Sequence, residues 1–258
     1  SLDRSPLAAM SLWMAGIPFR AGVDSQSRGI GLSFRVRPET NQHETTLYLD
    51  VVHLLGANTE DETPEFVVPD DVMERSRRFL TMGGDGPLVV IHPGGAVNPG
   101  TEMLEKRWPA TSFGELASLL VHEVGARIVL VGTETDRNAV DTVKDFARAP
   151  IIDLCGQLSL VELGAICKRA SLFVGNDSGV SHLAAGVGTP VVAIFGPTNP
   201  NRYRPLGRKT LVCAPTSSWN LTDTTDLRTA NRRDLPNTAN VPLPQVLNAS
   251  LELLGATV

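Results

Sequence analysis

The chain has 258 residues, 42% of them hydrophobic, and a formal net charge of −5 at pH 7. A chain of this length and composition can bury a large core, as one large domain or as two smaller ones. The negative charge argues against a general nucleic-acid-binding protein, and no stretch approaches the roughly 18 consecutive apolar residues of a membrane-spanning helix.

The first 80 residues contain few strand candidates. Their pattern predicts helices over 7–15, 43–55 and 72–80, with Asp70 and Asp71 capping the last, short strands over 21–24 and 29–36, and an extended segment over 64–69. Residues 81–87 are rich in Gly and Pro and are predicted to link two domains. We therefore predict that residues 1–82 form a partial domain that exposes an unpaired sheet edge or an apolar surface.

Positive charge is concentrated near the N-terminus. Residues 1–38 contain five arginines and two aspartates, although the chain as a whole is acidic. This local excess indicates either a solvated surface or a docking face for an anionic partner. No secretory signal peptide is visible, so we expect a cytoplasmic protein.

Strands and helices alternate regularly after the linker. The pattern predicts strands over 88–92, 127–131, 151–154, 172–174, 191–195 and 210–213, and helices over 112–124, 137–147, 160–170, 180–187 and 243–254. Such alternation is typical of right-handed βαβ units in a doubly wound parallel sheet. We assign residues 87–240 to this domain and residues 241–258 to a C-terminal helix. One arrangement that the sequence leaves open is that this helix packs against the first domain.

The most informative stretch is 171–198, in which Gly175-Asn176-Asp177-Ser178-Gly179 separates a buried strand from a short helix. A helix start offers unpaired amides and a positive dipole end, which suit a phosphate at the carboxyl edge of a parallel sheet. From these residues alone, a phosphate site and a capped turn without a ligand are equally good interpretations.

Three other polar residues lie where they can reach the same sheet edge. Lys106 could neutralise a diphosphate, or it could belong to a solvated loop beside a packed Trp108. Glu134 could accept hydrogen bonds from ribose hydroxyls, or it could cap the helix over 137–147. His182, one turn into the central helix, could point at a ligand or be an ordinary surface or core histidine. The three cysteines are widely spaced and predict neither a disulfide framework nor a zinc site.

Taken together, these motifs resemble glycosyltransferase family 9, the ADP-heptose:lipopolysaccharide heptosyltransferases, whose members have the GT-B fold. The matching motifs agree in order and spacing over residues 87–205. They are His92-Pro93-Gly94-Gly95, Lys106-Arg107-Trp108-Pro109, Gly132-Thr133-Glu134, Asp153-Leu154-Cys155-Gly156, Gly175-Asn176-Asp177-Ser178-Gly179, His182-Leu183-Ala184-Ala185 and Phe195-Gly196-Pro197-Thr198. A weaker likeness over residues 4–50 is to the second half of that family's acceptor-binding domain.

The resemblance implies an α/β protein with two Rossmann-like domains, the N-terminal one incomplete and the C-terminal one built on a parallel sheet. It implies that the C-terminal domain binds a nucleotide sugar. The implied donor-binding residues are Lys106, Asp177, Ser178 and Gly179 on the diphosphate, Glu134 on the ribose, Asp153 and Leu154 along the base, and Asp177 with His182 near the sugar and phosphates.

The implied reaction is the inverting transfer of a heptose from ADP-heptose to a lipopolysaccharide-core or related acceptor, with a carboxylate as the general base. Lys106 and the helix start would stabilise the diphosphate leaving group, so neither a metal nor a cofactor is expected. The arginines of residues 1–38 would suit an anionic lipid or saccharide acceptor. The resemblance also implies a peripheral contact with the inner membrane. It does not imply binding of nucleic acid.

The chain departs from the family pattern near its N-terminus. Members usually begin with a βαβ half whose Gly-Asp loop carries the base, and no such loop is found here. Asp3, Asp24 and Asp50 are the only nearby carboxylates that could substitute, so the general base is expected to be absent from this chain. A non-catalytic nucleotide-sugar-binding fragment or degenerate paralogue is therefore the alternative function. A sugar-nucleotide epimerase is disfavoured, because the Lys-Arg-Trp-Pro motif belongs to the transferase pattern.

Overall fold

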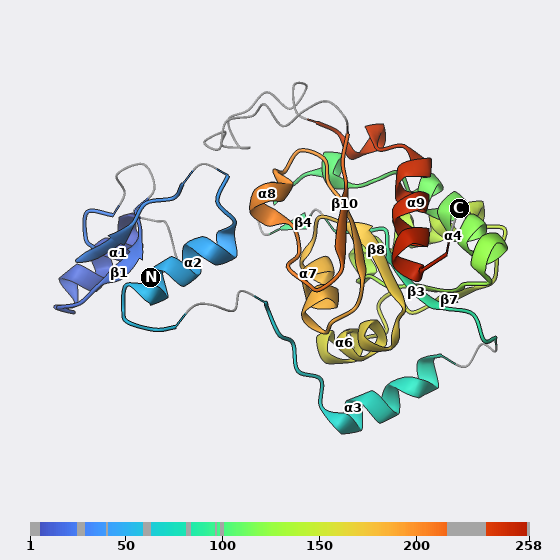
Figure 1. The fold of residues 1–258 in the computed structure, drawn as a ribbon, viewed down its shortest axis with the longest axis horizontal. Coiled ribbons are helices and arrows are strands. Elements are labelled where there is room, and N and C mark those ends of the chain that lie inside the picture. The colour runs from blue at the N-terminus through green and yellow to red at the C-terminus, as the bar shows by residue number, and fades with distance from the viewer. Residues whose placement is uncertain are drawn as a thin grey trace. The chain divides into compact units, whose positions relative to one another are not determined.

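The computed structural model describes residues 6–24, 29–39, 41–58, 63–80, 84–95, 97–98, 101–215 and 236–256. These residues form two compact units (Figure 1). Residues up to 58 together with 201–203 form the smaller unit, and the other described residues from Thr63 onward form the larger one. The division precedes Thr63, whereas the sequence predicts it at 81–87.

Among the described residues up to 58, the smaller unit contains two helices and two short parallel strands. They are α1 Pro6–Met14, β1 Ala21–Val23, β2 Phe34–Val36 and α2 Glu44–His53. The core of the unit consists of Val23, Leu47 and Val51. Of the side chains of α1, only Ala9 is buried, while Leu7, Trp13 and Met14 are exposed. The described part of this unit thus exposes an apolar surface, as the sequence predicts.

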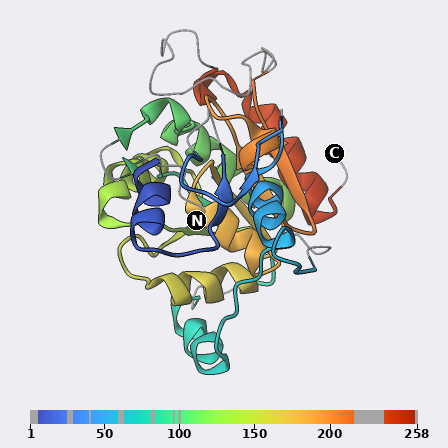
Figure 2. The same cartoon turned by 90° about the vertical axis from the view of Figure 1, so that its left-hand side faces the viewer.

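Residues 63–80 join the larger unit because they pack along α6 Leu160–Arg169. The segment comprises an extended stretch, α3 Asp70–Arg75 and the 3₁₀ helix η1 Ser76–Phe79, and Figures 1 and 2 both show α3 beside α6. The Phe66 amide donates to the Gly186 carbonyl at 2.8 Å, and Arg169 Nε donates to Ser76 Oγ at 2.9 Å. The predicted Asp caps are wrong, because Pro69 is the N-cap and both aspartates lie inside the first turn of α3.

A six-stranded parallel sheet forms the centre of the larger unit. In chain order its strands are β3 Leu88–His92, β6 Arg127–Leu130, β7 Ile151–Asp153, β8 Leu172–Asn176, β9 Val191–Ile194 and β10 Thr210–Cys213, and across the sheet they run β10-β9-β8-β3-β6-β7. The chain therefore winds outward from β3 in one direction and then returns to start again at β8 on the other side. This is the predicted doubly wound sheet, and its topological switch point lies between β3 and β8, where such sheets bind ligands.

Helices cover both faces of this sheet. They are α4 Ala110–Val124, α5 Arg137–Phe146, α6, α7 Gly179–Gly186 and α9 Leu243–Leu254. The short helix α8 Pro200–Tyr203 has three of its four residues in the smaller unit. The pair α4 and α5 and the pair α4 and α9 pack together, and α6 packs on α7. Strands β3 and β8 are fully buried, which explains their continuous apolar sequence. Helix α9 packs on α4 and on strands β8 to β10, so it belongs to the larger unit and not to the first domain.

Candidate functional site

The loop after β3 is tied to the end of β8 by one buried asparagine. Asn176 Nδ2 donates to the carbonyls of Pro93 and Gly94 at 3.1 and 3.0 Å, and its Oδ1 accepts from the Trp108 amide at 2.9 Å. Because Asn176 is wholly buried, these three bonds satisfy an amide that would otherwise be costly to bury. They also hold both motif loops over the switch point.

Lys106 and Asp177 meet at this edge. Lys106 Nζ lies 2.7 Å from Asp177 Oδ2, and both side chains are largely buried. Thr198 Oγ1 donates to the same carboxylate oxygen at 2.6 Å. The predicted cation is therefore next to the helix start, and it is paired with a carboxylate there.

The helix start itself is open. Helix α7 begins at Gly179, and its N-cap residue Ser178 makes no side-chain capping hydrogen bond. A Cβ atom added at Gly179 would meet no heavy atom within 4 Å, so there is free space beside the first turn. The interpretation in which the Ser178 side chain caps this turn is therefore wrong. The other interpretation, that the turn binds a phosphate, remains a prediction. His182 lies one turn further along α7 with an exposed side chain.

A second polar network, which the sequence did not reveal, surrounds Asp136 at the end of the 3₁₀ helix η3 Glu134–Asp136. One carboxylate oxygen accepts from the Gly95 amide at 3.1 Å and lies 3.4 Å from Arg107 Nη2. The other accepts from the Thr133 amide and hydroxyl at 3.0 Å and lies 3.6 Å from His92 Nε2. Burial alone would raise the pKa of Asp136, but the His92 imidazole and the backbone amides hold that pKa well below its usual range.

Arg107 completes this network, since its Nε donates to the Gly95 carbonyl at 2.8 Å. Gly95 has φ of +92°, and a Cβ atom there would lie 3.0 Å from Ser178 Cβ. Glycine is therefore needed at this position, both for the backbone conformation and for the approach to Ser178.

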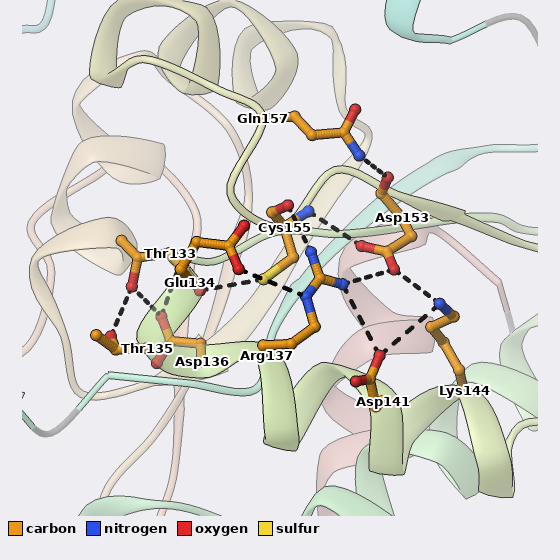
Figure 3. Close-up of polar contacts among 10 residues, drawn as sticks. All are labelled: Thr133, Glu134, Thr135, Asp136, Arg137, Asp141, Lys144, Asp153, Cys155 and Gln157. Carbon is orange, nitrogen blue, oxygen red and sulfur yellow. Dashed lines mark hydrogen bonds and ion pairs between the residues drawn. The ribbon is translucent and has the colours of Figure 1, made fainter.

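Glu134 is not a helix cap. Thr133 and Asp136 form the capping box of η3, and the Glu134 side chain is 74% exposed. In Figure 3 the Glu134 carboxylate lies near Arg137, with 4.0 Å between Oε2 and Nε. A Cβ atom on Gly156, which has φ of +72°, would lie 1.9 Å from Glu134 Oε1. The capping interpretation of Glu134 is thus wrong, and its contact with ribose remains a prediction.

Asp153 is held by basic residues of α5, as Figure 3 shows. Its Oδ2 lies 2.9 Å from Arg137 Nη1 and 2.8 Å from Lys144 Nζ, and its Oδ1 accepts from the Cys155 amide at 3.1 Å. Burial alone would raise the pKa of Asp153, but the bond from Lys144, the Cys155 amide and the charge of Arg137 lower it. The carboxylate is therefore engaged within the protein, and the neighbouring Leu154 side chain is buried.

The loop that carries Lys106 and Arg107 is fastened from the C-terminal part of the chain. The buried Trp108 ring packs edge-on against Phe113 with 4.9 Å between centroids, and its Nε1 donates to the Val241 carbonyl at 2.9 Å. Thr238 Oγ1 donates to the Glu105 carbonyl at 2.9 Å. The packed Trp108 and the cation beside the helix start thus occur together, although the sequence presents them as alternatives.

In the described ranges, no group of three or more His, Cys, Asp or Glu side chains is arranged to hold a metal ion. Cys155, Cys167 and Cys213 are buried and form no disulfide. Within the same ranges, no helix is both long and apolar enough to span a membrane.

Comparison with known proteins assigns the family. The model of glycosyltransferase family 9 (heptosyltransferase) matches residues 3–229. A lipopolysaccharide heptosyltransferase 3 of Escherichia coli is 30% identical over 161 residues, which are 61% of this chain and 45% of the relative. A lipopolysaccharide heptosyltransferase 2 of Escherichia coli K12 is 27% identical over 225 residues, 82% of this chain and 63% of the relative.

Two solved structures share the fold. An E. coli ADP-heptose lps heptosyltransferase II superposes with a TM-score of 0.72 at 21% identity over 98% of this chain and 75% of that one. A glycosyl transferase family 9 protein from Veillonella parvula superposes with a TM-score of 0.75 at 23% identity, over 95% of this chain and 70% of that one. The chain spans less than two thirds of the length of each of the two sequence relatives. The family model, in turn, matches most of this chain. The chain belongs to glycosyltransferase family 9, the heptosyltransferases.

Proposed function

We propose that the chain binds a nucleoside-diphosphate sugar, ADP-heptose, and forms the donor side of an inverting heptosyltransferase acting on a lipopolysaccharide-core or related acceptor. The observation that carries this proposal is the meeting of Lys106 with the open start of α7 at the switch point of the sheet. Family membership supports the choice of a heptose donor.

In this proposal the diphosphate lies against the first amides of α7 and beside the Lys106 ammonium group. An acceptor hydroxyl attacks the anomeric carbon from the face opposite the diphosphate, the bond from that carbon to the diphosphate oxygen breaks, and a carboxylate takes the hydroxyl proton. Lys106 and the helix start stabilise the negative charge that develops on the leaving diphosphate. The proposal includes no metal and no cofactor.

The remaining donor contacts follow from the same edge of the sheet. We assign the exposed Glu134 carboxylate to the ribose hydroxyls. Asp177, whose carboxylate is paired with Lys106, and His182 are placed near the sugar and phosphates. Because the Asp153 carboxylate is engaged by Arg137 and Lys144, contact with the base is assigned to the backbone of Asp153 and Leu154.

The acceptor side is assigned to the smaller unit. Arg35 and Arg37 lie 3.8 and 3.9 Å from Asp24, and their side chains are 48% and 83% exposed. Two exposed guanidinium groups on one carboxylate leave positive charge for an anionic lipid or saccharide. A cytoplasmic location at the face of the inner membrane is part of the proposal.

A non-catalytic role in nucleotide-sugar binding is the second candidate function. It is favoured because Asp24 and Asp50, two carboxylates that could replace the missing general base, are already engaged by other groups. Asp24 is buried and accepts from the Gly29 amide at 2.8 Å, besides its two arginine partners. Asp50 Oδ2 accepts from Gln42 Nε2 at 2.6 Å. Neither is poised as a general base, and Asp3 lies outside the described residues.

The test uses purified residues 1–258 with ADP-heptose, with and without a lipopolysaccharide-core acceptor. A thermal-shift panel of nucleoside diphosphates should single out ADP, since a ligand at 100 times its dissociation constant stabilises by about 2.7 kcal/mol. We expect binding with little turnover, because loss of a general base lowers rates by about 10²- to 10⁴-fold. ADP release that requires the acceptor would support the transferase and exclude the binding-only function for this stretch. No stabilisation by any nucleoside diphosphate would contradict both.

A further inference from the structure

Ser178 is an N-cap residue that does not cap its helix. Serine at this position normally accepts a hydrogen bond from one of the first amides of the helix. Here the backbone of Ser178 has the extended conformation of a cap, with φ of −153° and ψ of 163°, but the capping bond is missing. The hydroxyl instead lies 3.4 Å from His92 Nδ1.

His92 is held from its other side by Asp136. The imidazole is buried at the end of β3, and its Nε2 lies 3.6 Å from Asp136 Oδ2. The Gly95 amide, the Thr133 amide and hydroxyl, and Arg107 fix that carboxylate in place. The three side chains of Ser178, His92 and Asp136 thus form a row across the ends of β8, β3 and β6. Contacts of this length in a ligand-free site often shorten when the ligand binds.

We propose that the Asp136–His92 pair is a positioning device that keeps the Ser178 hydroxyl away from the start of α7, so that its first amides stay available to the donor diphosphate. This inference rests on the proposed function. The free space beside Gly179 supports it, because a ligand can reach those amides only while the hydroxyl is turned aside. Without the contact to His92, the hydroxyl caps the helix and competes with the diphosphate.

The two amide substitutions of His92 separate its two contacts. The Asn amide occupies roughly the place of Nδ1, so His92→Asn should keep the hold on Ser178. The Gln amide reaches the place of Nε2, so His92→Gln should keep the contact with Asp136 and release Ser178. We expect His92→Gln to weaken ADP about fivefold, the equivalent of a serine cap worth about 1 kcal/mol. His92→Asn should stay within about twofold of the wild type.

The decisive variant is His92→Gln combined with Ser178→Ala. If the released hydroxyl is the competitor, removing it should restore ADP affinity, so the double variant binds ADP more tightly than the single one. Adenosine affinity should be the same in all variants, because adenosine has no phosphate. The matched control is Ser181→Ala on the same helix, whose Oγ donates to the Asn176 carbonyl at 2.6 Å. It should not restore ADP binding in the His92→Gln background.

Calorimetric titrations of ADP and adenosine, with melting temperatures for each variant, decide the matter. His92→Ala provides a second route if His92→Gln does not fold, because it also removes the contact with Ser178; the same loss and the same restoration by Ser178→Ala are expected. An ADP loss that Ser178→Ala does not restore, or an equal loss for adenosine, would overturn the positioning role and leave the proposed function standing. So would weaker ADP binding by Ser178→Ala alone, which would make the hydroxyl a ligand. A wild type that binds no nucleoside diphosphate would overturn both.

Discussion

Lys106→Ala and Asp177→Asn should change the affinity for ADP in opposite directions. The two side chains form one ion pair, with 2.7 Å between Nζ and Oδ2, beside the open start of α7. A diphosphate at that start would meet the attraction of Lys106 and the repulsion of Asp177 together. Removing the lysine therefore removes a ligand and leaves a negative charge, whereas removing the aspartate charge frees the lysine.

The expected magnitudes follow from the contacts. A hydrogen bond to a charged group contributes about 1.5–3 kcal/mol, so Lys106→Ala should weaken ADP by about 10- to 150-fold. Asp177→Asn should strengthen ADP by about 1 kcal/mol, or about fivefold, in a site that is partly screened by solvent. Orphaning a buried charge costs about 3–5 kcal/mol, but Thr198 still donates to Asp177 at 2.6 Å, so Lys106→Ala should lower the free energy of unfolding by only about 1–2 kcal/mol.

Isothermal titration of ADP and adenosine at low and high salt checks this prediction, with thermal melts as the folding control. Adenosine should bind all three proteins equally. Unchanged ADP affinity in Lys106→Ala would rule the lysine out as a diphosphate ligand. Weaker ADP binding by Asp177→Asn would show that the carboxylate itself contacts the nucleotide or orders the site.

Three further outcomes are expected. Glu134→Ala should weaken ADP without lowering the melting temperature, because the side chain is exposed and Thr133 with Asp136 caps η3; a lower melting temperature with unchanged ADP affinity would contradict the ribose assignment. Gly156→Ala should weaken ADP and cost about 1 kcal/mol of stability, since φ is +72° and the new Cβ would displace Glu134, and equal ADP titrations would speak against it. The lowered pKa of Asp136 stabilises the fold fully above about pH 4, the usual carboxyl pKa, and this contribution is lost as pH falls further. Denaturant unfolding between pH 5 and 2 should therefore show a shallower pH dependence for Asp136→Asn than for the wild type, and identical slopes would exclude the effect.

The parallel sheet could be predicted from the sequence because its strands are continuous runs of buried apolar residues. Val89 to Ile91 and Leu172 to Val174 are fully buried, and such runs identify interior strands without any partner information. The helix α6 Leu160–Arg169 could be predicted for a different reason, because Ser159 and Glu162 have the Ser-x-x-Glu spacing of a capping box, which the structure contains.

Other features could not be read from local pattern. Residues 63–80 join the larger unit through Phe66, which packs against Gly164 and bonds to Gly186, and no periodicity announces such a contact. The network of His92, Arg107 and Asp136 joins residues from two βα loops, so it becomes visible only when the sheet is assembled. The cap at Thr133 is different, because the Thr-x-x-Asp spacing of its capping box is present in the sequence.

The hydrogen bond from Trp108 to Val241 affects when, during synthesis, the protein can first bind its ligand. The loop that presents Lys106 and Arg107 is held by the carbonyl of a residue about 130 positions later, and by Thr238 through Glu105. A ribosome-bound chain stopped before residue 238 would already contain all six strands of the sheet but would lack both fastenings. Ligand capture would thus mature after the sheet, once the segment that carries Thr238 and Val241 has been made and has closed on the loop.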